Sequence, residues 1–154
     1  LKTRNPQQAD YHQAKVLAEK SVQTGSKAGE IVLARVLVNQ QAGTPNYPHA
    51  ITLLQHAAQD PESDSAVDAQ MLLGLIYASG VHLPEDDVKA TQYFKESSAL
   101  SRTGYAEYWA GMLFLQGEKG FIEPNRQKAL HWLNVSCQEG FDTGCEEFDR
   151  ISKR

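Results

Sequence analysis

Apolar residues recur every three or four positions along nearly the whole chain, which is the spacing of a helix that buries one face. No stretch shows the sustained apolar and polar alternation that is typical of strands. Glycines, prolines and polar clusters separate the periodic stretches and mark where helices stop and start. We therefore predict an all-α chain with helices near residues 10–24, 27–42, 48–58, 66–79, 85–99, 105–116, 125–138 and 143–152.

One pattern of residues occurs twice in the second half of the chain, at a period of roughly 40 residues. The first copy contains Ala69, Leu73-Gly74, Tyr77, Gly80 and Lys89-Ala90, and the second contains Ala106, Ala110-Gly111, Phe114, Gly117 and Lys128-Ala129. A weaker copy precedes them, with Leu33-Ala34 and His49-Ala50 at matching positions. A repeat of this length cannot bury its apolar face alone and must stack on a neighbour.

The repeats predict a right-handed αα-solenoid of stacked antiparallel helix pairs, in a single domain over residues 1–154. Within it we expect a half repeat (10–26), a degenerate repeat (27–61), two full repeats (65–104 and 105–142) and a C-terminal capping helix (143–152). Gly74 and Gly111 are expected where paired helices approach too closely for a side chain, and Gly80 and Gly117 where helices end.

Charge and hydropathy exclude two classes of partner. The 154 residues carry a net charge of −4 with a pI near 5.7, whereas a nucleic-acid-binding protein needs a clustered basic face. The longest apolar runs are far shorter than the roughly 20 residues of a membrane helix, so we expect no membrane insertion of this segment. The chain begins at Leu1 without a methionine, as a processed or trimmed chain does.

Cys137 and Cys145 flank a segment with glycines at 140 and 144, which predicts a helix end, a tight turn and a helix start. That geometry can bring the two Cβ atoms within the roughly 4 Å that a disulfide requires. We favour a disulfide over two free buried thiols, and with it an oxidising compartment, periplasmic or extracellular, over the cytoplasm.

The sequence offers no recognisable catalytic or cofactor site. The histidines at 12, 49, 56, 82 and 131 lie on different elements, and none pairs at the spacing of metal ligands on one helix. The usual contexts of a nucleophilic serine are missing, and the glycines follow the repeat instead of forming a phosphate-binding loop. We predict neither catalytic residues nor a metal or cofactor, and the chain is expected not to be an enzyme. An enzyme acting on cell-wall or β-lactam substrates is the less favoured alternative.

The series Ala69, Leu73, Gly74, Tyr77, Gly80, Lys89 and Ala90 resembles the Sel1-like repeat, a relative of the tetratricopeptide repeat. The resemblance covers roughly residue 28 to the C-terminus. Cys137 and Cys145 also resemble the helix-linking disulfide of the family's cysteine-rich, secreted branch, but Ser97 or Ser98 stands at the corresponding place one repeat earlier.

The resemblance implies a protein that binds other proteins, as an adaptor or scaffold of a bacterial envelope or secretion-related complex. The alternative is an immunity protein that neutralises a specific toxin. In related arrays the first helix of each repeat lines a groove, which gives these candidate contact residues: Ile31, Arg35, Val38, Asn39, Met71, Leu75, Ser79, Tyr105, Tyr108, Met112, Leu115 and Gln116. Each of them can equally be a core residue. The partner is expected to be another protein, whose identity the sequence does not give.

Overall fold

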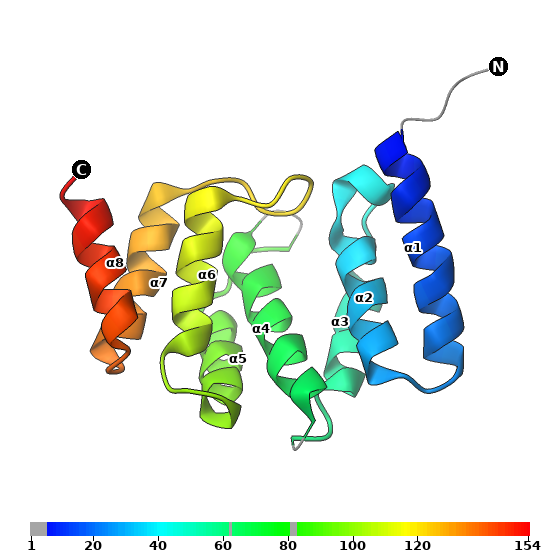
Figure 1. Cartoon of the computed structure of the whole chain (residues 1–154), viewed down its shortest axis with the longest axis horizontal. Helices are drawn as coiled ribbons and strands as arrows, with labels where there is room; N and C mark the ends of the chain where they lie inside the picture. The colour runs from blue at the N-terminus through cyan, green and yellow to red at the C-terminus, as the bar shows by residue number, and fades with distance from the viewer. Residues whose placement is uncertain (1–5, 62, 81–82) are drawn as a thin grey trace. The chain divides into compact units, whose positions relative to one another are not determined.

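The computed structural model describes residues 6–61, 63–80 and 83–154, with side chains from residue 10 onward, and helices joined by turns and loops make up this part of the chain (Figure 1). The elements are α1 (Pro6–Gln23), α2 (Lys27–Val38), the short 3₁₀ helix η1 (Gln40–Ala42), α3 (Tyr47–Ala57), α4 (Asp64–Ser79), α5 (Asp87–Leu100), α6 (Tyr105–Gln116), α7 (Arg126–Gln138) and α8 (Asp142–Ser152). Within the described ranges, extended pairing is limited to an isolated bridge between Glu118 and Ile122. The predicted all-α class is confirmed.

Four of the α-helices begin where a polar side chain caps the first turn. The side chains of Ser26, Asn46, Asp86 and Asn125 each accept a hydrogen bond from a backbone N–H three residues further on, at 3.0 to 3.1 Å. Because the Asp86 side chain caps the helix, α5 begins at Asp87, two residues later than predicted. α1 begins earlier than predicted, and α2 ends at Val38 because the chain turns there into η1.

The chain divides into two compact units. The first comprises Leu1–Ala69 with Lys119–Phe121, and its helix α2 packs on both α1 and α3 around Leu33, Ala34 and Leu54. The segment Lys119–Phe121 joins this unit through hydrogen bonds. Gln40 N–H donates to Gly120 O at 2.7 Å, and the Asn39 side-chain amide donates to Lys119 O at 3.2 Å.

The second unit comprises Gln70–Glu118 with Ile122–Arg154, and in it α5, α6, α7 and α8 pack in succession (Figure 1). Its core contains Phe94, Phe114, Trp132 and Leu133, all almost fully buried. The ring of Phe94 meets that of Trp132 edge-on, with centroids 4.9 Å apart. The apolar stripes of successive helices therefore form one continuous core within this unit.

Two pairs of glycines behave as the repeat predicts. A Cβ added at Gly74 would lie 2.6 Å from the ring of Phe94, and one at Gly111 would lie 2.7 Å from Leu133 Cγ. Gly80 and Gly117 end α4 and α6 with φ of +67° and +76°, a region that side chains rarely adopt. The boundaries of the individual repeats, and their assignment to a single domain, stay predictions.

Candidate protein-binding surface

Helix α6 carries the accessible part of the predicted binding face. It begins after Gly104, which has a φ of +83°, and ends where Gly117 N–H donates to Leu113 O at 2.6 Å. Its fully buried side is formed by Ala106, Glu107, Ala110 and Phe114. The predicted contact residues of this helix are all at least partly accessible: Tyr105, Tyr108, Met112, Leu115 and Gln116.

Three aromatic rings gather at the beginning of α6. Tyr105 is 39% exposed, and its ring centroid lies 6.4 Å from that of Tyr108 and 6.0 Å from that of Phe141. Tyr108 and Phe141 are closer, at 5.2 Å, and Phe141 itself is buried in the turn before α8. The Arg102 guanidinium lies 5.1 Å from the centre of the Phe141 ring. The cluster thus combines rigid aromatic surface with a cationic edge.

The other candidate residues lie mostly in the interior. Arg35 is exposed, but six candidates are buried: Ile31, Val38, Asn39, Met71, Leu75 and Ser79. Asn39 holds the chain around it, since its Oδ1 accepts from Gln41 N–H at 2.8 Å and its amide donates to Lys119 O. Ser79 Oγ donates to Ile76 O within its own helix at 3.0 Å. These six are therefore core residues, which is one of the two interpretations that the sequence left open, and the accessible candidates are Arg35 and the five residues of α6.

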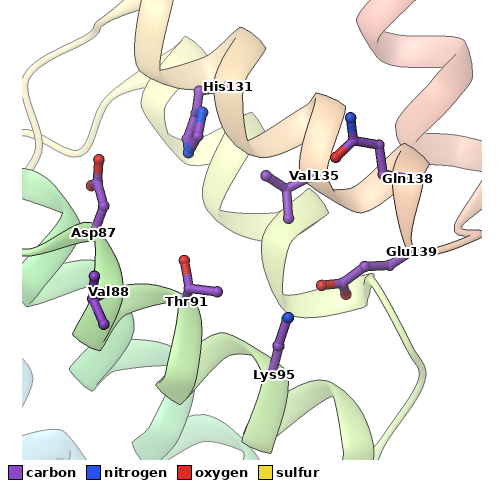
Figure 2. Close-up of a pocket in the computed structure, with 8 residues that line it drawn as sticks. All are labelled: Asp87, Val88, Thr91, Lys95, His131, Val135, Gln138 and Glu139. Atoms are coloured by element: carbon purple, nitrogen blue, oxygen red, sulfur yellow. The ribbon is translucent and has the colours of Figure 1, made fainter.

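A cleft of about 500 Å³ lies between α5 and α7 in the second unit, and sequence reasoning missed it (Figure 2). Its lining comes from successive turns of the two helices: Asp87, Val88, Thr91 and Lys95 of α5, and His131, Val135, Gln138 and Glu139 at or after α7. Val88 is 79% exposed, an unusual position for a β-branched apolar side chain. The repeat alignment gave no signal for this cleft, since its α5 residues Thr91 and Lys95 align with Leu130 and Asn134, which do not line it.

Glu139, at one end of this cleft, interacts with a second glutamate, Glu107. Glu107 is fully buried, and its Oε2 accepts a hydrogen bond from Ser98 Oγ at 2.9 Å. Burial raises the pKa of Glu139 above the ordinary 4.5, and the neighbouring Glu107 carboxyl raises it further, whereas Lys95 lowers it. The charge at this end of the cleft therefore depends on three side chains from three helices.

The Cys137–Cys145 disulfide is present, with an S–S distance of 1.98 Å and Cα atoms 4.5 Å apart. It joins the last turn of α7 to the first turn of α8, as the spacing predicts. Because Phe141 lies in the loop that this bond closes, the disulfide also fixes the turn that supports Tyr105 and Tyr108.

The described part of the chain contains neither a metal-binding cluster nor a membrane-spanning helix. No group of three or more His, Cys, Asp or Glu side chains there is arranged to hold a metal ion. His82 lies outside the described residues. No described helix is both long enough and apolar enough to cross a bilayer.

Helix pairs packed at a regular period, with an accessible stripe on α6, define an αα-repeat protein. The family model of the Sel1 repeat matches residues 67–101 and 104–141. The Sel1-repeat-containing protein YjcO of Escherichia coli strain K12 is 69% identical over 152 residues, which are 99% of this chain and 66% of that protein. The chain belongs to the Sel1 repeat family, as the resemblance predicts. Sel1 repeats are protein-interaction modules, not an enzyme fold.

Solved structures and a more distant relative agree with this assignment. The crystal structure of a Sel1 repeat protein from Klebsiella pneumoniae subsp. pneumoniae matches with a TM-score of 0.91 and 82% identity, over 97% of this chain and 72% of that one. It confirms the predicted helical solenoid. A Sel1 repeat protein from Oxalobacter formigenes shares the fold at a TM-score of 0.54 and 17% identity, over 91% of this chain and 54% of that one. The alginate biosynthesis protein AlgK of Azotobacter vinelandii is 28% identical over 134 residues, which are 70% of this chain and 28% of AlgK.

Proposed function

We propose that this chain is an adaptor that binds another protein through the exposed face of α6, within a complex of the bacterial cell envelope. The observation that carries the proposal is the accessible stripe on that helix. Tyr105, Tyr108 and Met112 follow one another at spacings of three and four residues, so they lie on one side of α6.

The chemistry of this stripe suits a protein interface. Tyrosines bury a large area at a small entropic cost, and a few such anchors dominate most interfaces. Methionine adds an unbranched side chain that adapts to a partner's surface. Tyr105 and Tyr108 are already positioned by Phe141, so little of their freedom remains to be lost on binding.

The envelope is the compartment that the disulfide favours, because such bonds persist in oxidising environments such as the periplasm or the exterior. The relative AlgK is named as an alginate biosynthesis protein, and this similarity favours an adaptor over an inhibitor of one toxin. Both inferences are proposals for this chain.

Site-specific photo-crosslinking in intact cells tests the proposal. A photoreactive phenylalanine is placed at Tyr105 in one variant and at Val88 on α5 in a matched control, since both side chains are exposed. We expect position 105 to capture a discrete envelope protein that position 88 does not. Binding of that protein to the purified chain should then weaken by about 1–3 kcal/mol in Tyr105→Ala.

Tyr108→Ala should weaken the same complex, with a small additional loss of stability because Tyr108 also packs on Phe141. Val88→Ala should leave the affinity unchanged. Capture from position 88 alone, or equal affinity of the parent and Tyr105→Ala, would move the binding surface away from α6. Capture of a toxin would favour the immunity alternative at the same surface.

A further inference from the structure

Glu107 occupies a position that carboxylates rarely tolerate. It lies in the first turn of α6 with no exposed surface, and buried carboxyl groups are normally paired or fully hydrogen-bonded. Ser98 supplies one donor to Oε2. Within the described structure Oε1 is buried and finds no donor, so half of this group's hydrogen-bonding capacity is unmet.

Glu139 meets Glu107 from the other side. It caps the C-terminal end of α7 and lines the α5–α7 cleft, where its carboxyl group is turned inward (Figure 2). Its Oε1 is also buried without a donor among the described residues, and its carboxyl group interacts with that of Glu107. Ionised carboxylates are acceptors only, so two of them in contact repel each other unless a proton lies between them.

Lys95 is the cation that competes with such a proton. It reaches toward Glu139 from α5, across the end of the cleft, and its own side chain is exposed to solvent (Figure 2). Asp87 and His131 are the other ionisable residues of the cleft lining. Burial and the Glu107 carboxyl raise the pKa of Glu139, whereas Lys95 lowers it.

We propose that Glu107 and Glu139 share one proton, and that this proton makes the packing of α6 against the end of α7 sensitive to pH. The disulfide ties Cys137, two residues before Glu139, to α8 and so restrains the backbone at the end of α7. The Glu139 side chain already lines the cleft with Lys95 facing it, so on loss of the proton it moves away from Glu107 and toward Lys95. Deprotonation therefore separates the two carboxyl groups and changes both the charge and the shape of the cleft.

The direction of the pH effect follows from the raised pKa. The folded protein holds the shared proton at pH values where the unfolded chain has released it. The stabilising contribution is complete below the ordinary glutamate value of 4.5 and declines as the pH rises through the higher value in the folded protein.

The test compares urea denaturation of the parent, Glu139→Gln and the control Glu146→Gln, from about pH 4.5 to about pH 8. Glutamine at 139 supplies a permanent N–H donor to Glu107, whereas Glu146 is an exposed residue of α8. The denaturation midpoint of the parent and of Glu146→Gln should fall as the pH rises across this range. In Glu139→Gln the part of this fall that comes from loss of the shared proton should be absent.

A second measurement reads the shared proton directly and distinguishes it from a merely structural role. The side-chain carboxyl ¹³C resonance of Glu139, followed by NMR, should titrate above the ordinary range in the parent. Lys95→Met should move its titration to higher pH, because the ammonium that favours the ionised form is lost, and Glu107→Gln should move it to lower pH.

Titration of Glu139 in the ordinary range in the parent would overturn the proposal. So would the same pH dependence of the denaturation midpoint in the parent and in Glu139→Gln. Should Glu107→Gln fail to fold, the Lys95→Met titration and the Glu139→Gln denaturation decide the matter without it.

Discussion

Two helix–turn–helix junctions in the second unit close the same kind of turn with different chemistry. At the α7–α8 junction Cys137 and Cys145, eight residues apart, are covalently bonded. At the α5–α6 junction Ser98 and Ala106 are also eight residues apart, and Ser98 Oγ accepts a hydrogen bond from Ala106 N–H at 3.1 Å. The hydrogen bond of Ser98 therefore links the two helices at the same place in the repeat where the disulfide links α7 to α8.

The difference between the junctions reflects what else holds each helix. Helix α6 packs on α5, α7 and α8, so a hydrogen bond at its start is supported on several sides. Helix α8 packs on α7 and touches α6 at few points, and its position depends more on the bond at its start. A covalent link lowers the entropy of the unfolded chain, so it stabilises this junction however few helices pack on α8.

The α6–α7 contact is common to both junctions, so breaking it should have the largest effect. Gly111→Leu places a side chain where even a Cβ would lie 2.7 Å from Leu133 Cγ and 3.1 Å from Ala129 O. Overpacking of this kind costs about 1–3 kcal/mol and occasionally more, and we expect the upper end because one obstacle is backbone. Urea denaturation measures the loss.

Ala99→Leu is the matched control for Gly111→Leu, because Ala99 is an exposed residue of α5 where a larger side chain meets solvent. Its denaturation midpoint should stay close to that of the parent. A Gly111→Leu protein that unfolds at the parent's urea concentration would show that α6 and α7 do not approach as closely as the comparison of the junctions requires.

Removing the disulfide should have the next largest effect. The double variant Cys137→Ser, Cys145→Ser opens a short loop, and loop-entropy reasoning gives a loss of about 2–3 kcal/mol in the free energy of unfolding. Thiol titration of the unfolded, unreduced parent should find close to no free thiols. Two free thiols per chain would remove both the covalent side of the comparison and the main support for an oxidising compartment.

Local patterns made much of the fold predictable. Helix limits followed from caps and glycines, and α6 begins and ends at the predicted residues because Gly104 and Gly117 lie just outside it. The close approach at Gly111 followed from the repeat alignment. The cysteine spacing predicted the disulfide, since a turn and the first residues of a helix fix the geometry over so short a span.

Exposure was less predictable, because it depends on neighbours that are distant in the sequence. Met71 and Leu75 occupy the first-helix positions that α6 leaves accessible, yet both are buried. Trp132 is in the core, whereas Trp109, which lies on α6, is only partly buried. Helical periodicity gives the direction of a side chain from its helix but not what covers it.

The buried glutamate had a signal in the repeat that sequence reasoning did not use. Gln70 and Glu107 both follow the first alanine of the repeat pattern, at Ala69 and Ala106. A polar residue at the same place in two copies indicates a constrained position, and each of these side chains has a buried oxygen without a donor among the described residues. The sequence could not show that Glu139 would meet Glu107, since that contact depends on how α7 ends.

The smallest effect is expected at the hydrogen-bonded junction. Ser98→Ala removes the acceptor for Ala106 N–H and the donor to Glu107 Oε2, two buried hydrogen bonds whose combined net contribution is about 1–2 kcal/mol. Ser152→Ala, in an exposed position, is the control and should change little. Urea denaturation of the two variants in parallel gives the difference. A loss in Ser98→Ala as large as that of the cysteine double variant would mean that the serine junction supports its helix as strongly as the covalent bond does. The contrast between a well-supported α6 and a dependent α8 would then have to be abandoned.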